Sequence, residues 1–231
     1  MFTIVSLAWN GAELTDGFLY RLKKYTDVPH KLVFSDNGST EPIEAIVRDY
    51  YPDVTFIRYD ENIGCPLTRN PSMEKVDTDI VFWLDNDTYV GEGWYKPYLE
   101  LLEKEPDVAM TGPVGLRVAN PFSIGKPWKT QEEFTGDYCD WFVGYAVAFR
   151  KKFYKPIPDW NLKVNMDDVD VGIGVKVSGG KCKILPTKPN LEHLCSKTSL
   201  SVRPTGEQNL KVMEKWWKRW KDDKDFFEEY K

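Results

Sequence analysis

The segment Ile80–Val90, with the sequence IVFWLDNDTYV, constrains the fold of this chain more than any other. An unbroken apolar run leads directly into Asp85, Asn86 and Asp87. A short continuous run of this kind is typical of a strand that is buried on both faces, as in a parallel sheet. Two carboxylates at the end of such a strand are costly unless a partner satisfies them, and a divalent cation with oxygen ligands does so. The competing interpretation is a polar turn without a ligand, because Asp and Asn favour turns.

Strands and helices are predicted to alternate through the first half of the chain. The predicted strands are Phe2–Leu7, Lys31–Phe34, Val54–Arg58 and Ile80–Leu84. The predicted helices are Glu13–Tyr25, a second one capped by Thr40 with Pro42 in its first turn, and Pro66–Glu74. This alternation predicts an α/β fold with a mostly parallel central sheet, flanked by helices and joined by right-handed crossovers.

The second half is less regular. We expect helices at Trp94–Lys104, Asp167–Val177 and Glu207–Lys231, strands at Val108–Thr111, Trp141–Phe149 and Lys181–Leu185, and long loops at Arg117–Thr135 and Thr187–Gly206. Gly144, inside the strand predicted at Trp141–Phe149, permits the close approach of another group. We interpret residues 1–231 as one domain, in which about 1–112 bind a nucleotide, about 113–206 form a smaller acceptor-side region, and 207–231 form the closing helix.

Composition narrows the class of protein. The net charge of −5 argues against a nucleic-acid-binding protein, because such proteins are usually basic. The four cysteines are scattered without a CxxC pair, which favours reduced thiols in a cytoplasmic protein. No apolar run reaches the length of about 18 residues that a transmembrane helix needs.

The closing helix leaves a question of membrane contact open. Its tryptophans Trp216, Trp217 and Trp220 are interleaved with basic residues, as in helices that lie on a membrane surface. Acidic residues follow in the same helix and would oppose anionic lipid, so we favour packing on the protein body. A cytoplasmic location, with weak peripheral membrane contact as the alternative, is the expectation.

Three polar clusters fall at the ends of predicted parallel strands. They are Asp36-Asn37-Gly38-Ser39, Asn62-Ile63-Gly64 and Asp85-Asn86-Asp87. Each cluster alone is weak evidence for a binding site, since every strand ends in a turn. Parallel strands, however, bring their carboxyl ends to the same edge of the sheet. That edge would hold a ligand of nucleotide size, with Asp36 bonded to a base or ribose and the later aspartates bound to a metal–diphosphate.

Five segments together resemble a known family. They are SDNGSTE, ENIGCPLTRN, WLDNDTYV, MDDVDVGIGVKVSGGK and EHLCSKT, and they span about Phe2 to Thr198. In this order they resemble the family 2 glycosyltransferases of the GT-A fold. The resemblance implies a Rossmann-like sheet and a metal-dependent, inverting transfer of a sugar from a UDP-, GDP- or dTDP-linked donor to a hydroxyl of a saccharide or lipid-linked acceptor.

The resemblance also assigns roles on the donor side. It implies nucleotide contacts from Asp36 and donor contacts from Asn62, Gly64 and Arg69. Asp85 and Asp87 match the D-x-D motif, with Asn86 between them at the donor. His193 matches a histidine that completes the metal site, to which Mn²⁺ or Mg²⁺ would bind, although a lone loop histidine is more often structural. Lys197 and Arg203 would add positive charge near the diphosphate, unless they are simply solvated.

The catalytic base is expected at Asp167-Asp168. This pair matches the family's acidic motif, whose first member is more often Glu, so the choice between Asp167 and Asp168 stays open. The alternative is that Asp168 merely suits the dipole at a helix N-terminus.

Two other functions compete with glycosyl transfer. A nucleotidyltransferase that makes an activated sugar would usually carry a glycine-rich, basic loop after the first strand, whereas this chain has Ala8-Trp9-Asn10-Gly11. A non-catalytic carbohydrate-binding protein on the same fold would not need Asp85, Asp87 and Asp168 together. The sequence leaves the donor sugar, the nucleobase, the acceptor and the oligomeric state open.

Overall fold

The computed structural model describes residues 1–116, 138–159 and 167–195, together with six isolated positions near the C-terminus. These six positions, all helical, are Glu207, Lys211, Glu214, Lys215, Lys218 and Arg219. The predictions for the loop Arg117–Thr135, for Lys197 and Arg203, and for the three tryptophans of the closing helix therefore lie outside the described residues.

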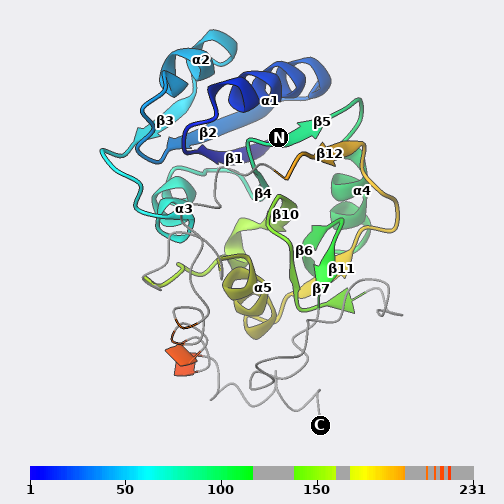
Figure 1. Ribbon diagram of the computed structural model, residues 1–231. Helices are drawn as coiled ribbons and strands as arrows, with labels where there is room; N and C mark the ends of the chain where they lie inside the picture. The colour runs from blue at the N-terminus through cyan, green and yellow to red at the C-terminus, as the bar shows by residue number, and fades with distance from the viewer. Residues whose placement is uncertain are drawn as a thin grey trace.

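Strands and helices alternate as expected through the first half (Figure 1). The helices are α1 (Ala12–Tyr25), α2 (Ile43–Tyr50), α3 (Cys65–Glu74), α4 (Lys96–Lys104) and α5 (Asp167–Val177), with a 3₁₀ turn, η2, at Lys151–Phe153. The longer strands are β1 (Phe2–Ala8), β2 (His30–Asp36), β3 (Thr55–Arg58), β4 (Ile80–Leu84), β6 (Val108–Gly112), β10 (Ala146–Arg150) and β11 (Lys181–Ile184). The short strands are β5 (Thr88–Val90), β7 (Gly115–Leu116), β8 (Tyr138–Cys139), β9 (Trp141–Phe142) and β12 (Leu191–His193).

The central sheet has eight strands in the order β3-β2-β1-β4-β10-β6-β11-β8. β1, β2, β3 and β4 pair in parallel, as do β6 and β11, whereas β10 is antiparallel to both β4 and β6. Two small antiparallel pairs, β5 with β12 and β7 with β9, lie beside this sheet. The prediction of a mostly parallel sheet flanked by helices is confirmed.

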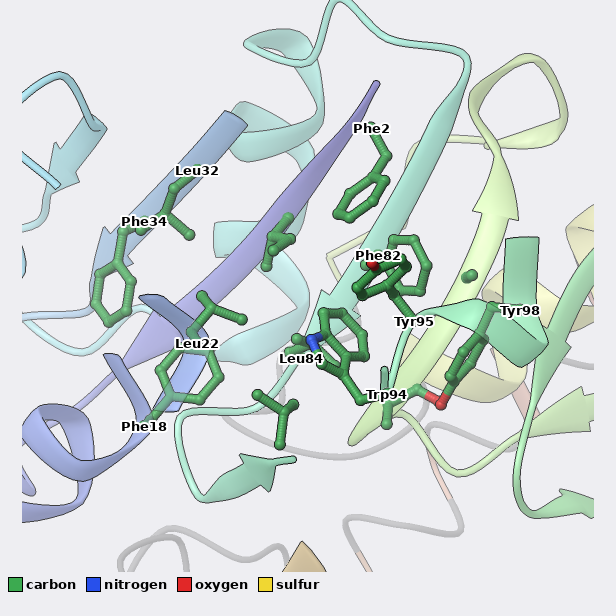
Figure 2. Close-up of a cluster of buried hydrophobic side chains, with 14 of the residues drawn as sticks. Phe2, Phe18, Leu22, Leu32, Phe34, Phe82, Leu84, Trp94, Tyr95 and Tyr98 are labelled. Atoms are coloured by element: carbon green, nitrogen blue, oxygen red, sulfur yellow. The ribbon is translucent and has the colours of Figure 1, made fainter. Parts of the chain in front are cut away.

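Helices cover the sheet on both faces, which explains why its strands read as continuous apolar runs. Along β4, Phe82 and Leu84 pack in a core with α1, α2 and α4, while Val81 and Trp83 pack in a second core with α3 and α5. Figure 2 shows the first of these cores, in which the rings of Phe2 on β1, Phe82 on β4 and Trp94 before α4 pack together. Phe18 and Leu22 of α1 lie in the same core. Two rigid cores thus hold the C-terminal edge of β4, where the acidic cluster begins.

Three predictions of local structure were wrong. The strand expected at Trp141–Phe149 is broken at residues 143–145, because β9 pairs with β7 while β10 joins the central sheet. The loop expected at Thr187–Gly206 contains a strand, β12, which is held by pairing with β5 rather than by a local pattern. Thr40 does not cap α2, since its hydroxyl and amide both donate to the Asn10 side chain, and Pro42 precedes the helix instead.

Among the helices that the described ranges contain, none combines the length and apolar character required to cross a bilayer.

Candidate active site

The loops that follow β2 and β3 are joined by two asparagine side chains. The Asn37 amide donates to Asn62 Oδ1 at 3.1 Å, and the same oxygen accepts the backbone N–H of Gly64 at 2.9 Å. Gly38 has a φ of +78°, and a Cβ there would lie 2.3 Å from the Glu61 backbone, so the two loops can approach only with glycine at this position. The first two polar clusters of the sequence therefore form one surface.

Asp36, at the end of β2, is fully buried. Its Oδ1 accepts the Ser39 backbone N–H at 2.9 Å, and its Oδ2 pairs with the Arg58 guanidinium. Arg58 ends β3 directly opposite Asp36 in the parallel register, and it also donates to the Ser39 carbonyl at 2.7 Å. The sequence analysis missed Arg58. Its role becomes visible only from the strand register, which sets this arginine opposite Asp36.

The acidic cluster after β4 is held in a turn by the strand beside it. The Asp85 amide donates to the Tyr145 carbonyl at 2.9 Å, and the Thr88 amide donates to the Asp85 carbonyl at 3.0 Å. Pairing of β12 with β5 sets His193 opposite Thr88, and the His193 Nε2 lies 3.3 Å from Asp87 Oδ1. As a result, Asp85, Asp87 and His193 each offer one ligand atom within 4.8 Å of the others.

The electrostatics of this cluster suit a divalent cation. Burial raises the pKa of Asp85 to about 6, and the neighbouring charge of Asp87 adds to the rise while Arg69 opposes it. The hydrogen bond with Asp87 raises the pKa of His193. Two carboxylates and one imidazole from three different positions form a donor set that Mn²⁺ or Mg²⁺ accepts, and the charge of the ion would offset the repulsion between the two acids.

Arg69 connects the acidic cluster to the N-terminus of α5. Its side chain is only 3% exposed, with one guanidinium nitrogen 3.6 Å from Asp85 and another 3.2 Å from Asp167. The guanidinium carbon lies over a Trp83 ring, 4.1 Å from the ring centre, in a cation–π contact. Arg69, predicted as a donor contact, thus lies between two acids that are far apart in the chain.

The adjacent acids at the start of α5 have different partners. Asp167 Oδ2 takes the Arg69 ion pair and lies 3.3 Å from the Cys65 thiol, a contact for which our sequence reasoning had no signal. Asp168 Oδ2 accepts the Gly144 backbone N–H at 3.3 Å. Burial, with the charge of Asp167 next, raises the pKa of Asp168 to about 7. A pKa near neutrality is what a general base at neutral pH requires.

Asn86, which was predicted to contact the sugar donor, points toward α1 instead. The Asn86 side chain donates to the Thr15 hydroxyl on α1 at 2.9 Å, so it fastens the acidic turn to the helix.

A mostly parallel sheet with the Asp85, Asp87 and His193 cluster at its edge and an acid pair at the start of α5 is the arrangement of the GT-A glycosyltransferases. The model of glycosyl transferase family 2 matches residues 3–158, and the chain belongs to this family. Membership of this family favours glycosyl transfer over the nucleotidyltransferase and non-catalytic alternatives.

Solved structures share the fold at low sequence identity. The mannosyltransferase PcManGT from Pyrobaculum calidifontis, in complex with GDP-Man and Mn²⁺, is 15% identical with a TM-score of 0.66, over 94% of this chain and 69% of that one. S. aureus TarS 1-349, in complex with UDP-GlcNAc, is 16% identical with a TM-score of 0.68, over 93% of this chain and 65% of that one.

A curated relative matches a shorter stretch. The teichoic acid poly(glycerol phosphate) polymerase of Staphylococcus epidermidis is 29% identical over 102 residues, which cover 42% of this chain and 14% of the relative. The chain thus corresponds to a small part of that protein's length.

Proposed function

We propose that the protein is a metal-dependent, inverting glycosyltransferase that uses a nucleotide-diphospho-sugar donor. The observation that carries the proposal is the link from the Asp85, Asp87 and His193 cluster through Arg69 to the acid pair at α5. Through this link, the metal cluster, which suits a leaving diphosphate, and Asp168, which suits an acceptor proton, lie at one edge of the sheet. PcManGT and TarS, which share the fold, were solved with GDP-Man and with UDP-GlcNAc, which supports a donor of this class without fixing its base or sugar.

Each group has a role in the proposed reaction. Asp36 binds the base or ribose, and Asn62 and Gly64, in the loop that Asn37 joins to it, contact the donor. Asp85, Asp87 and His193 would hold Mn²⁺ or Mg²⁺, which when bound neutralises the charge of the leaving nucleoside diphosphate. Lys197 and Arg203 remain predicted sources of further positive charge at that diphosphate.

Asp168 completes the mechanism on the acceptor side. Its carboxylate removes the proton from the acceptor hydroxyl as that oxygen attacks the anomeric carbon. Attack from the face opposite the leaving group, in a single displacement, inverts the anomeric configuration. Asp167 stays paired with Arg69 and so keeps that positive charge beside Asp85. The acceptor proposed is a saccharide or lipid-linked hydroxyl.

Metal dependence gives the first test. We expect Asp87→Ala to weaken Mn²⁺ binding by at least about 100-fold, because even the loss of groups that only support a ligand costs about 10–100-fold. Isothermal titration of Mn²⁺, and then of nucleoside diphosphates with and without EDTA, measures the effect. Asp53→Ala, at an exposed acid before β3, is the matched control and should bind as the wild type does. Nucleotide affinity that EDTA leaves unchanged in the wild type contradicts the proposal.

A further inference from the structure

Tyr145 contacts both the acidic turn after β4 and the His193 imidazole. It lies between β9 and β10, directly before the residue that pairs with Leu84 at the end of β4. Its carbonyl accepts the Asp85 amide at 2.9 Å and the Thr88 hydroxyl at 3.1 Å. Its ring stacks on the His193 imidazole, with the centroids 4.4 Å apart and the planes 3° from parallel.

From this geometry we infer that Tyr145 is a positioning residue for the metal site, acting through the ring plane of His193. The inference rests on the metal site in the proposed function. An imidazole can serve as a ligand only while its nitrogen points at the ion, and rotation about its side-chain torsions would turn the nitrogen away. A parallel aromatic neighbour removes part of this freedom, so less order has to be imposed when the ion binds.

The contacts around His193 show why the ring stack matters. The His193 Nε2 faces Asp87, and its Nδ1 lies 3.5 Å from the Cys195 thiol. A thiol is a weak hydrogen-bonding partner, so it restrains the imidazole less than the carboxylate or carbonyl that usually orients a metal-binding histidine. Among the described residues, the Tyr145 ring covers the face of the imidazole, which the in-plane partners leave open.

The same segment also reaches the candidate base. Gly144, the residue before Tyr145, donates its backbone N–H to Asp168, and a Cβ at Gly144 would lie 3.2 Å from the Asp168 Cβ. Residues 144–145 therefore contact both the candidate base and the acidic cluster. A side-chain substitution at Tyr145 leaves this backbone in place and removes only the stacking ring.

The test is Mn²⁺ binding to the free protein, measured by isothermal titration and by electron paramagnetic resonance of the unbound ion. We expect Tyr145→Phe to bind as the wild type does. Tyr145→Leu should bind about three- to tenfold more weakly, which corresponds to the usual strength of an aromatic pair. Tyr145→Met, whose flexible side chain refills the site, gives the same expected loss should the leucine variant fold poorly. Tyr89→Leu, a tyrosine of β5 that lies against Gly17 and Arg21 instead, is the matched control and should bind normally.

A double-mutant cycle separates positioning from general structure. In a His193→Ala background, Tyr145→Leu should cause no further loss of Mn²⁺ affinity. The inference is overturned by an unchanged affinity in Tyr145→Leu, by an equal loss in Tyr89→Leu, or by a loss that persists without His193. A wild type that does not bind Mn²⁺ overturns the metal site of the proposed function as well. Binding that Asp87→Ala abolishes and Tyr145→Leu leaves intact overturns this inference alone.

Discussion

At the scale of single residues, the acid pair at α5 shows how neighbours with the same side chain acquire different chemistry. Asp167 forms an ion pair with Arg69 and also contacts the Cys65 thiol. Asp168 accepts backbone N–H groups from Gly144 and Val169. The sequence left the choice between the two acids open, and these partners favour Asp168 as the base.

Asp168→Asn should lower kcat by about 10²–10⁴, which is the usual contribution of a general base. The donor Kd should stay nearly unchanged, because the proton moves only in the transition state. Turnover assays on the purified variant, with the donor Kd from titration, provide the measurement, and Asp167→Asn should lower kcat less. Near-normal turnover in Asp168→Asn together with loss in Asp167→Asn would move the assignment by one residue.

The raised pKa of Asp168 also predicts how activity and stability depend on pH, and Asp168→Asn tests both. The fold raises the pKa of Asp168 from 3.8 to about 7, so the protonated form is the one that the folded state favours. Activity needs the carboxylate and should therefore rise with pH through about 7 at saturating Mn²⁺. Stability should change in the opposite sense, since the preference for the protonated form is lost as pH rises through the folded pKa. Asp168→Asn should abolish this stability change, and a wild-type rate that is flat between pH 5 and pH 8 would contradict the assignment.

At the scale of elements, strand register explains a site residue that the sequence pattern did not reveal. Asp36 follows from its place in SDNGSTE, whereas its partner Arg58 follows only from the pairing of β2 with β3. The pair also means that Asp36 is oriented before any nucleotide arrives, because Arg58 and the Ser39 amide hold both of its oxygens.

Asp36→Asn should weaken nucleoside diphosphate binding by about tenfold or more, since a hydrogen bond to a charged group contributes about 1.5–3 kcal/mol. Asparagine keeps the shape of the buried side chain, which limits the damage to the fold. Titration with the nucleoside diphosphate, with and without its sugar, should show the same loss in both cases. Equal affinity in variant and wild type would mean that the base and ribose bind elsewhere.

The predictable elements are those whose signal is local. The apolar run of β4 and the helical period of α1 are visible in any short window, and both elements were found where expected. β12 has no such signal, because three residues with no apolar pattern become a strand only through β5. The break before β10 was missed for the same reason: WFVGYAVAF is uniformly apolar, and the choice between two sheets is made by partners far away in the chain.

At the scale of the whole molecule, the site exists only when both halves of the chain are folded together. Arg69 from the first half joins Asp85 to Asp167, and His193 returns from the end of the second half to meet Asp87. The family motifs predicted which residues take part. They did not predict that one buried arginine would tie the acidic cluster to the base region, because that depends on how α3 and α5 pack against the same face of the sheet.

Arg219, one of the described positions near the C-terminus, contacts α5 and the residues before it. Arg219 lies 3.1 Å from Asp170, which is 1% exposed, and also donates to the Pro156 carbonyl at 3.2 Å. The carboxylate it neutralises is two residues from Asp168. Removing a cation from beside a buried carboxylate is unfavourable, so Arg219 should contribute to the stability of α5.

Arg219→Met should lower the free energy of unfolding by roughly 2–3 kcal/mol at pH 7, less than for a fully enclosed pair because the arginine is partly exposed. Urea denaturation gives the measurement, and Lys218→Met at the exposed neighbouring position is the control. Adding Asp170→Asn should recover part of the loss, because the double variant no longer buries a carboxylate without its cation. Should Arg219→Met unfold at the wild-type urea concentration, or the second substitution only add to the loss, the ion pair between Arg219 and Asp170 would not be a source of stability.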